Sequence, residues 1–191
     1  MTYTIRRKLF AFAIAAVCAV STPVKAQDTA LRGPVILTIS GDVDAASRGP
    51  VNEDYDKFFV FNEVEFQSAA QFDFAALQTL DTVKVSTDFP MGGDRHEFEG
   101  PTLKSVLDAA GIHATDASIV TMRALDGYAI EVSYGELINA GAIVAYRRDG
   151  AFFAIGDFGP TMIIFPRSDR ADLADMNDDW WIWSIYHINV E

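Results

Sequence analysis

The stretch "SIVTMRALDGYAIEV", residues 118–132, decides the class of fold, because it contains two strand-like runs on either side of a tight turn. Both runs are rich in apolar and β-branched residues, which favour extended backbone. Asp126-Gly127 separates them, and this dipeptide is typical of two-residue hairpin turns. The sequence therefore predicts an antiparallel pair of strands in this region.

Further strands are predicted on both sides of this hairpin. A second hairpin is expected around Asp149-Gly150, and other strand-like runs lie at 33–44, 82–87, 161–166 and 181–190. In the last run, alternation predicts that Trp181 and Trp183 lie on one face of a strand and Trp180 on the other. Trp183 is the tryptophan that this pattern favours most strongly as a core residue.

Three short helices are predicted among these strands. Asp73 is a candidate N-cap for the first, residues 100–112 form the clearest helix with Gly111 as its stop, and residues 134–141 suit one or two turns. Residues 58–67 fit a strand or a helix equally well. Because helices and strands alternate irregularly, we predict a single α+β domain with a mixed or antiparallel, β-rich core and a few short helices.

The first 26 residues have the pattern of an export signal. Arg6, Arg7 and Lys8 precede an apolar run from Leu9 to Val20, and cleavage is expected after Ala26. That run is shorter than the roughly 20 residues that a membrane span needs. The sequence therefore predicts a periplasmic protein whose mature part, residues 27–191, is one domain.

Charge and cysteine content exclude several classes of function. Removal of residues 1–26 would leave 11 basic against 27 acidic residues, a formal charge of −16, so nucleic acid is not an expected partner. The only cysteine, Cys18, lies in the predicted signal peptide. The mature chain therefore has no disulfide, cysteine-zinc site or cysteine nucleophile. The three histidines are too scattered to predict a histidine-rich metal site.

Five motifs in a fixed order resemble the oxidoreductase molybdopterin-binding domain, which has the fold of sulfite oxidase. They are "FEGPTLKSVLDAAGI" (98–112), "ALDGYAIEVSYGEL" (124–137), "IVAYRRDG" (143–150), "GDFGPTMIIFP" (156–166) and "DDWWIWSIYHINV" (178–190). The resemblance covers residues from about Asp73 to the end of the chain. It implies a mixed α+β domain with a β-rich core.

The same resemblance raises a question about chemistry. In catalytic members of this family a cysteine thiolate holds molybdenum, on the loop that corresponds here to the end of "TVKVSTDFP". This chain has Ser86, Thr87 and Asp88 at that place and no cysteine in its mature part. We therefore expect no molybdenum and no catalytic residue. The alternative is a molybdopterin-dependent oxidoreductase that lacks the cysteine ligand.

The chain is most similar to the small, exported, cysteine-lacking branch of this family, which includes PruR-type proteins. That similarity implies a reduced pterin as ligand, without phosphate or metal. It also implies signalling to the periplasmic domain of an inner-membrane GGDEF/EAL protein, an enzyme that makes and degrades cyclic di-GMP. A third possibility is an interaction domain with a degenerate pocket.

A pterin site needs a carboxylate for the N–H edge of the ring and an aromatic face for stacking. Asp178 and Asp179 lie beside three tryptophans and supply these groups, although a solvated loop and a packed core would explain the same residues. The resemblance places Tyr128 near the family's pocket and Phe89 on the loop that replaces the cysteine segment. Asp157 and Phe158 precede Gly159-Pro160, in a turn that either presents a carboxylate and a ring to a ligand or is a simple loop. The predicted ligand-binding residues are Phe89, Tyr128, Asp157, Phe158, Asp178, Asp179 and Trp181.

Overall fold

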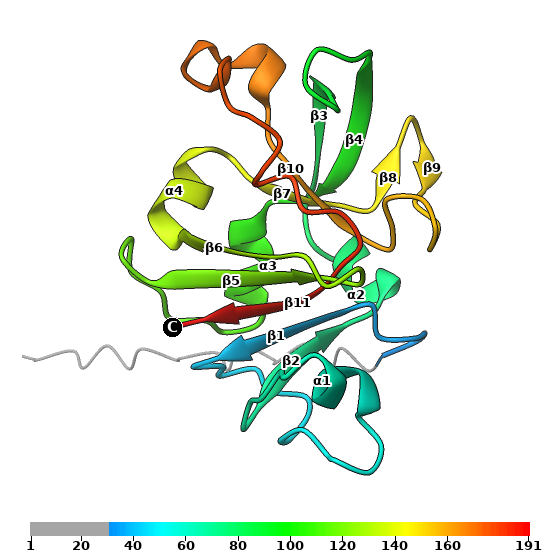
Figure 1. The fold of residues 1–191 in the computed structure, drawn as a ribbon, viewed down its shortest axis with the longest axis vertical. Helices are drawn as coiled ribbons and strands as arrows, with labels where there is room; N and C mark the ends of the chain where they lie inside the picture. The colour runs from blue at the N-terminus through cyan, green and yellow to red at the C-terminus, as the bar shows by residue number, and fades with distance from the viewer. Residues whose placement is uncertain (1–30) are drawn as a thin grey trace, which may run out of the picture.

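A five-stranded sheet forms the base of the structure, a computed structural model that describes residues 31–191 (Figure 1). Its strand order is β2-β1-β11-β5-β6. The bounds are β1 Leu37–Gly41, β2 Ala69–Phe72, β5 Ile119–Ala124, β6 Ala129–Ser133 and β11 Ile185–Val190. β1 and β11 run parallel, and the other neighbours run antiparallel. The predicted α+β class with a mixed sheet is confirmed.

The hairpin predicted for residues 118–132 is present in the structure. β5 and β6 pair antiparallel, with Val120 opposite Val132, and Gly127 in the turn has a φ of 91°. Asp126 accepts a hydrogen bond from the Tyr128 amide at 3.0 Å, which closes the turn locally. Short-range turn chemistry is therefore enough to fix this part of the fold.

A second, smaller sheet rises above the first in Figure 1. It contains β3 (Thr82–Asp88), β4 (Arg95–Pro101), β8 (Arg147–Arg148) and β9 (Ala151–Phe152), in that order. β7 (Ile143–Ala145) pairs with β10 (Met162–Ile164) between the two sheets. A Cβ at Gly100 would lie 2.0 Å from the Val144 carbonyl oxygen, so only glycine allows this approach of β4 to β7.

The helices are short and most are capped by side chains. They are α1 Lys57–Phe61, α2 Phe74–Gln78, α3 Leu103–Ala109 and α4 Tyr134–Asn139, with 3₁₀ turns η1 Arg167–Asp169 and η2 Ala171–Leu173. Asp73 accepts a hydrogen bond from the Ala76 amide at 2.7 Å, which confirms the predicted N-cap. None of the helices in residues 31–191 has the length and hydrophobicity needed to cross a bilayer. The predicted signal peptide lies outside the described residues.

The two faces of the five-stranded sheet differ in character. One face contributes Ile39, Met122 and Ile188 to the main core, which also includes Leu103 and Leu107 of α3. On the other face the strands present polar residues, and a small cluster that includes Val64 and Phe66 covers part of it. The polar residues on this face include Thr38, Ser40, Arg123 and His187.

The last strand corrects one prediction. β11 begins at Ile185 rather than at Trp181, because Ser184 has a φ of 52° and interrupts the extended backbone. Alternation therefore does not pass through the tryptophans. Trp183 is 38% exposed, whereas Trp181 is 2% exposed, so the prediction that Trp183 is the core tryptophan is wrong.

Candidate functional site

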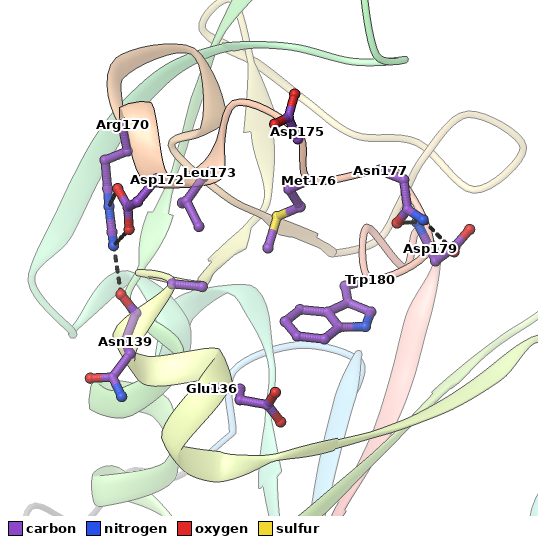
Figure 2. Close-up of a pocket in the computed structure, with 11 residues that line it drawn as sticks. Glu136, Asn139, Arg170, Asp172, Leu173, Asp175, Met176, Asn177, Asp179 and Trp180 are labelled. Atoms are coloured by element: carbon purple, nitrogen blue, oxygen red, sulfur yellow. Dashed lines mark hydrogen bonds and ion pairs between the residues drawn. The ribbon is translucent and has the colours of Figure 1, made fainter.

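A pocket of about 620 Å³ lies between α4 and the segment that contains η2 and residues 175–180 (Figure 2). In Figure 2, Leu173, Met176 and Trp180 extend from this segment toward α4, and Glu136 lies across from them. We call this site the Trp180 pocket. Its lining residues are Glu136, Asn139, Ala140, Arg170, Asp172, Leu173, Asp175, Met176, Asn177, Asp179 and Trp180.

Arg170 connects the two sides of the Trp180 pocket. Its Nη1 donates to the Asn139 carbonyl oxygen at 2.6 Å, at the end of α4. Its Nε donates to the Asp172 carboxylate at 3.1 Å, and its Nη2 donates to the same carboxylate. The hydrogen bond with Arg170 lowers the pKa of Asp172 below its usual range. All three nitrogens of the Arg170 guanidinium therefore already make hydrogen bonds within the protein.

The remaining charge of the pocket is negative. Besides Asp172, the lining includes the carboxylates of Glu136, Asp175 and Asp179, while Arg170 is the only cation among the lining residues. Carboxylates accept hydrogen bonds and donate none when ionised. The site is suited to ligands that present N–H groups, and it disfavours phosphates.

Trp180 forms the aromatic wall of this pocket. Its side chain is half-buried and packs against Phe165, with ring centroids 6.3 Å apart. The preceding residue, Asp179, is held by Asn177, whose amide donates to the Asp179 carboxylate at 2.7 Å. The Tyr128 hydroxyl donates to the Asp179 carbonyl oxygen at 3.0 Å, which links the rim of the pocket to the β5–β6 hairpin.

Directly beside Trp180, a buried guanidinium organises a second group of residues that we call the Arg167 cluster: Arg167, Asp88, Phe89, Asp178 and Trp181. Arg167 is 3% exposed. It donates to the carboxylate of Asp88 at 3.1 Å and to that of Asp178 at 2.7 Å. Its Cζ lies 4.4 Å from the Trp181 ring centroid. A buried charge is stable only when paired in this way.

Aromatic rings complete the Arg167 cluster. The rings of Phe89 and Trp181 are stacked, with centroids 5.6 Å apart and an interplanar angle of 8°. Phe158 contacts Phe89 edge-on at 5.3 Å. Such contacts are typical of packed cores and stabilise the fold in addition to burying area.

The structure does not bring the seven predicted site residues together in one place. Asp179 lines the Trp180 pocket, and Tyr128 supports its rim. Phe89, Asp178 and Trp181 belong to the Arg167 cluster instead, and Phe158 packs edge-on against Phe89. Asp157 lies 3.5 Å from Arg148 in an exposed ion pair and does not line the pocket. Their roles in binding remain predictions.

Asp178 illustrates why a carboxylate near a pocket is not always a ligand. One of its oxygens accepts from Arg167, and the other accepts from the Met91 amide at 2.8 Å. Both oxygens are therefore engaged within the protein. Asp178 connects the loop after β3 to the segment before Trp181.

The sequence did not predict most of the residues that line the Trp180 pocket. Glu136, Asp175, Met176 and Trp180 line it but were not among the predicted residues. The acidic run "DRADLADMNDD", residues 169–179, was the available signal, because an aspartate occupies every third position from Asp169 to Asp178. The strand pattern drew attention to Trp181 and Trp183 instead.

No family model matches the chain, and no curated protein matches it. Within residues 31–191, no group of three or more His, Cys, Asp or Glu side chains is arranged to hold a metal ion.

Proposed function

We propose that this domain is a non-catalytic binding protein for a reduced pterin that carries no phosphate, and that the pterin occupies the Trp180 pocket. The observation that carries the proposal is the combination of an indole wall and several carboxylates in one pocket of about 620 Å³. This volume lies within the range of roughly 300–1,000 Å³ that is usual for small-molecule sites.

The chemistry of a pterin matches these groups. The 2-amino group and the neighbouring ring N–H point along one edge of a flat bicycle, and a carboxylate can accept hydrogen bonds from both. Asp175 and Asp179 are exposed carboxylates in the pocket lining that could serve this edge. The indole of Trp180 would stack on the ring face.

The charge of the site supports a ligand without phosphate. Phosphate sites in proteins use arginine clusters or free backbone N–H groups. In the Trp180 pocket, Arg170 already serves Asp172 and the Asn139 carbonyl, and three further carboxylates surround the cavity. An anionic ligand would be repelled here.

We extend the proposal to location and partner on the strength of the family resemblance. The mature protein would act in the periplasm and signal to the periplasmic domain of an inner-membrane GGDEF/EAL protein. Pulldown of that partner from native membranes, with and without added tetrahydropterin, tests this part. Capture that does not depend on the pterin would contradict it.

Calorimetry under anaerobic conditions tests the binding itself, with 6-methyltetrahydropterin as the probe and a phosphorylated tetrahydropterin as the comparison. We expect the first to bind at micromolar concentration and the second at least tenfold more weakly. Asp175→Asn and Asp179→Asn should each weaken binding of 6-methyltetrahydropterin. Lys104→Met, on the exposed surface of α3, is a suitable control.

Two results would overturn the proposal. One is the absence of binding by folded protein at micromolar concentrations of 6-methyltetrahydropterin. The other is stoichiometric molybdenum in protein isolated from its native compartment, because this would favour the oxidoreductase alternative.

A further inference from the structure

A chain of hydrogen bonds crosses the polar face of the five-stranded sheet, away from the Trp180 pocket. The Asn189 amide nitrogen donates to Glu191 at 2.7 Å, so the amide oxygen of Asn189 faces Ser40. The Ser40 hydroxyl donates to that oxygen at 2.7 Å. Ser40 also lies 2.9 Å from Nε2 of His187. The three hydrogen bonds therefore run in one direction, from His187 through Ser40 and Asn189 to Glu191.

This direction fixes the tautomer of His187. A hydroxyl has a single hydrogen, and Ser40 uses it on Asn189. The contact between Ser40 and His187 therefore requires the hydrogen to lie on Nε2 of the imidazole. Nδ1 is left with a lone pair and acts as an acceptor.

That acceptor is buried without a partner. His187 is 1% exposed, and its Nδ1 has no hydrogen-bond partner among residues 31–191. Burial, assisted by the charge of Arg123, lowers the pKa of His187 to about 3, so the ring is neutral at physiological pH. Buried polar atoms in native proteins almost always have a partner, so Nδ1 is an exception within residues 31–191.

A small pocket lies next to this imidazole. Its volume is about 200 Å³, and it is lined by Glu63, Val64, Glu65, Arg123, His187, Asn189 and Glu191. Ser40 is on β1, on one side of β11, whereas Arg123 is on β5 and pairs with His187 from the other side. We call this site the His187 pocket.

The charged groups of the His187 pocket are separated rather than paired. Among residues 31–191, no carboxylate oxygen lies within the 4.0 Å ion-pair distance of Arg123. One guanidinium and three glutamates therefore border the same small space, beside the His187 ring. This arrangement leaves both a cation and several acceptors available to a ligand.

We propose that the His187 pocket binds a small α-amino acid. The ligand's carboxylate would pair with Arg123, and its ammonium group would donate to the glutamates beside the His187 ring. A carboxylate ligand alone would meet three glutamates, and an amine alone would leave Arg123 without a partner. A volume equal to roughly six or seven waters admits only a small side chain such as that of glycine or alanine.

The test is a titration followed through the imidazole ¹⁵N signals, with glycine, alanine, acetate and methylamine as separate probes. We expect glycine and alanine to shift the Nδ1 signal of His187 while the signals of His96 and His113 stay in place. Acetate and methylamine should bind at least tenfold more weakly. None of the residues involved lines the Trp180 pocket, so the result is independent of pterin binding.

Variants assign the two ends of the ligand. Arg123→Met should weaken glycine binding at least tenfold and leave methylamine unchanged, and Glu63→Gln with Glu65→Gln should weaken both. Arg123→Lys serves if Arg123→Met does not fold, and Lys104→Met is the matched control. The proposal is overturned if glycine and alanine at about 10 mM, tenfold above a Kd of 1 mM, leave the His187 signal unmoved. It is equally overturned if methylamine binds as tightly as glycine.

Discussion

Trp180 and Trp181 are neighbours in the sequence, yet they belong to different regions of the molecule. Trp180 is half-buried and lines an open, acidic pocket, whereas Trp181 is 2% exposed and lies against Arg167 and Phe89. Both rings contact Phe165. The Trp180 pocket therefore rests on the Arg167 cluster, and we infer that one binds while the other holds the fold.

The contacts of Arg167 show how the wall of the Trp180 pocket is held in place on irregular backbone. Residues 174–184 contain no helix or strand that could position a ring. Arg167 provides the anchor instead, because it donates to the Met176 carbonyl and to the Asp178 carboxylate, each at 2.7 Å. A buried, fully paired guanidinium substitutes here for secondary structure.

The largest expected effect is that of Trp181→Ala. Removal of a buried indole leaves a cavity, and such changes cost about 3–5 kcal/mol. Urea denaturation of the purified domain measures this as a loss in the free energy of unfolding. Trp180→Ala is the matched control and should cost no more than about 1 kcal/mol. Equal losses for the two variants would contradict the division of roles.

Arg167→Met is expected to have the next largest effect on stability. The variant leaves the carboxylates of Asp88 and Asp178 without their cation, and both are only partly exposed. We expect a loss of about 2 kcal/mol, less than for a fully buried pair because water still reaches both acids. Lys84→Met, which removes an exposed cation on β3, should be nearly neutral. A loss of less than about 0.5 kcal/mol for Arg167→Met would argue against Arg167 as an anchor.

The pH dependence of stability offers a finer test of the Arg167 cluster. Burial alone would raise the pKa of Asp88, but hydrogen bonds from Gly92, Ser168 and Arg167 outweigh it and lower the pKa. A lowered pKa in the folded state stabilises the protein above the unfolded value of roughly 3.9. This contribution should be lost as the pH falls from about 4 through the folded pKa. In Asp88→Asn the loss over that range should be smaller, and an unchanged acid profile would speak against this role of Asp88.

Tyr128→Phe should have the smallest effect. It removes the hydrogen bond from the Tyr128 hydroxyl to the Asp179 carbonyl, on the exposed rim of the Trp180 pocket. Such a bond contributes about 0.5–1.5 kcal/mol at most, so the free energy of unfolding should change little. Affinity for 6-methyltetrahydropterin should fall by less than tenfold. A complete loss of binding would show that Tyr128 contacts the ligand directly.

Local signals predicted the parts of the fold that depend on neighbouring residues. Asp73 caps α2 and Asp126-Gly127 turns β5 into β6, because both effects act within three or four positions. The sequence did not predict β2, whose partner β1 is distant in the chain, or β4, which pairs with the neighbouring β3 and with the distant β8. It also did not predict the left-handed Ser184, which interrupts the strand pattern, or the exposure of Trp183.

The candidate site was predictable only in part, for the same reason. The Trp180 pocket combines α4 with residues 170–180, and Arg170 reaches back 31 positions to Asn139. Asp178 was predicted as a ligand because no local signal shows that Arg167 and the Met91 amide occupy it. Composition identified an acidic, aromatic segment, and tertiary contacts then determined which side chains face the pocket.

The most direct test of the binding role is the affinity of 6-methyltetrahydropterin for the unaltered domain, for Trp180→Ala and for Trp183→Ala. Trp183 is exposed and does not line the pocket, so its variant controls for the loss of an indole. We expect micromolar binding by the unaltered protein and by Trp183→Ala, and binding at least tenfold weaker by Trp180→Ala, a difference of about 1.4 kcal/mol. Equal affinity of all three proteins, or no binding by any of them, would contradict the assignment of the Trp180 pocket.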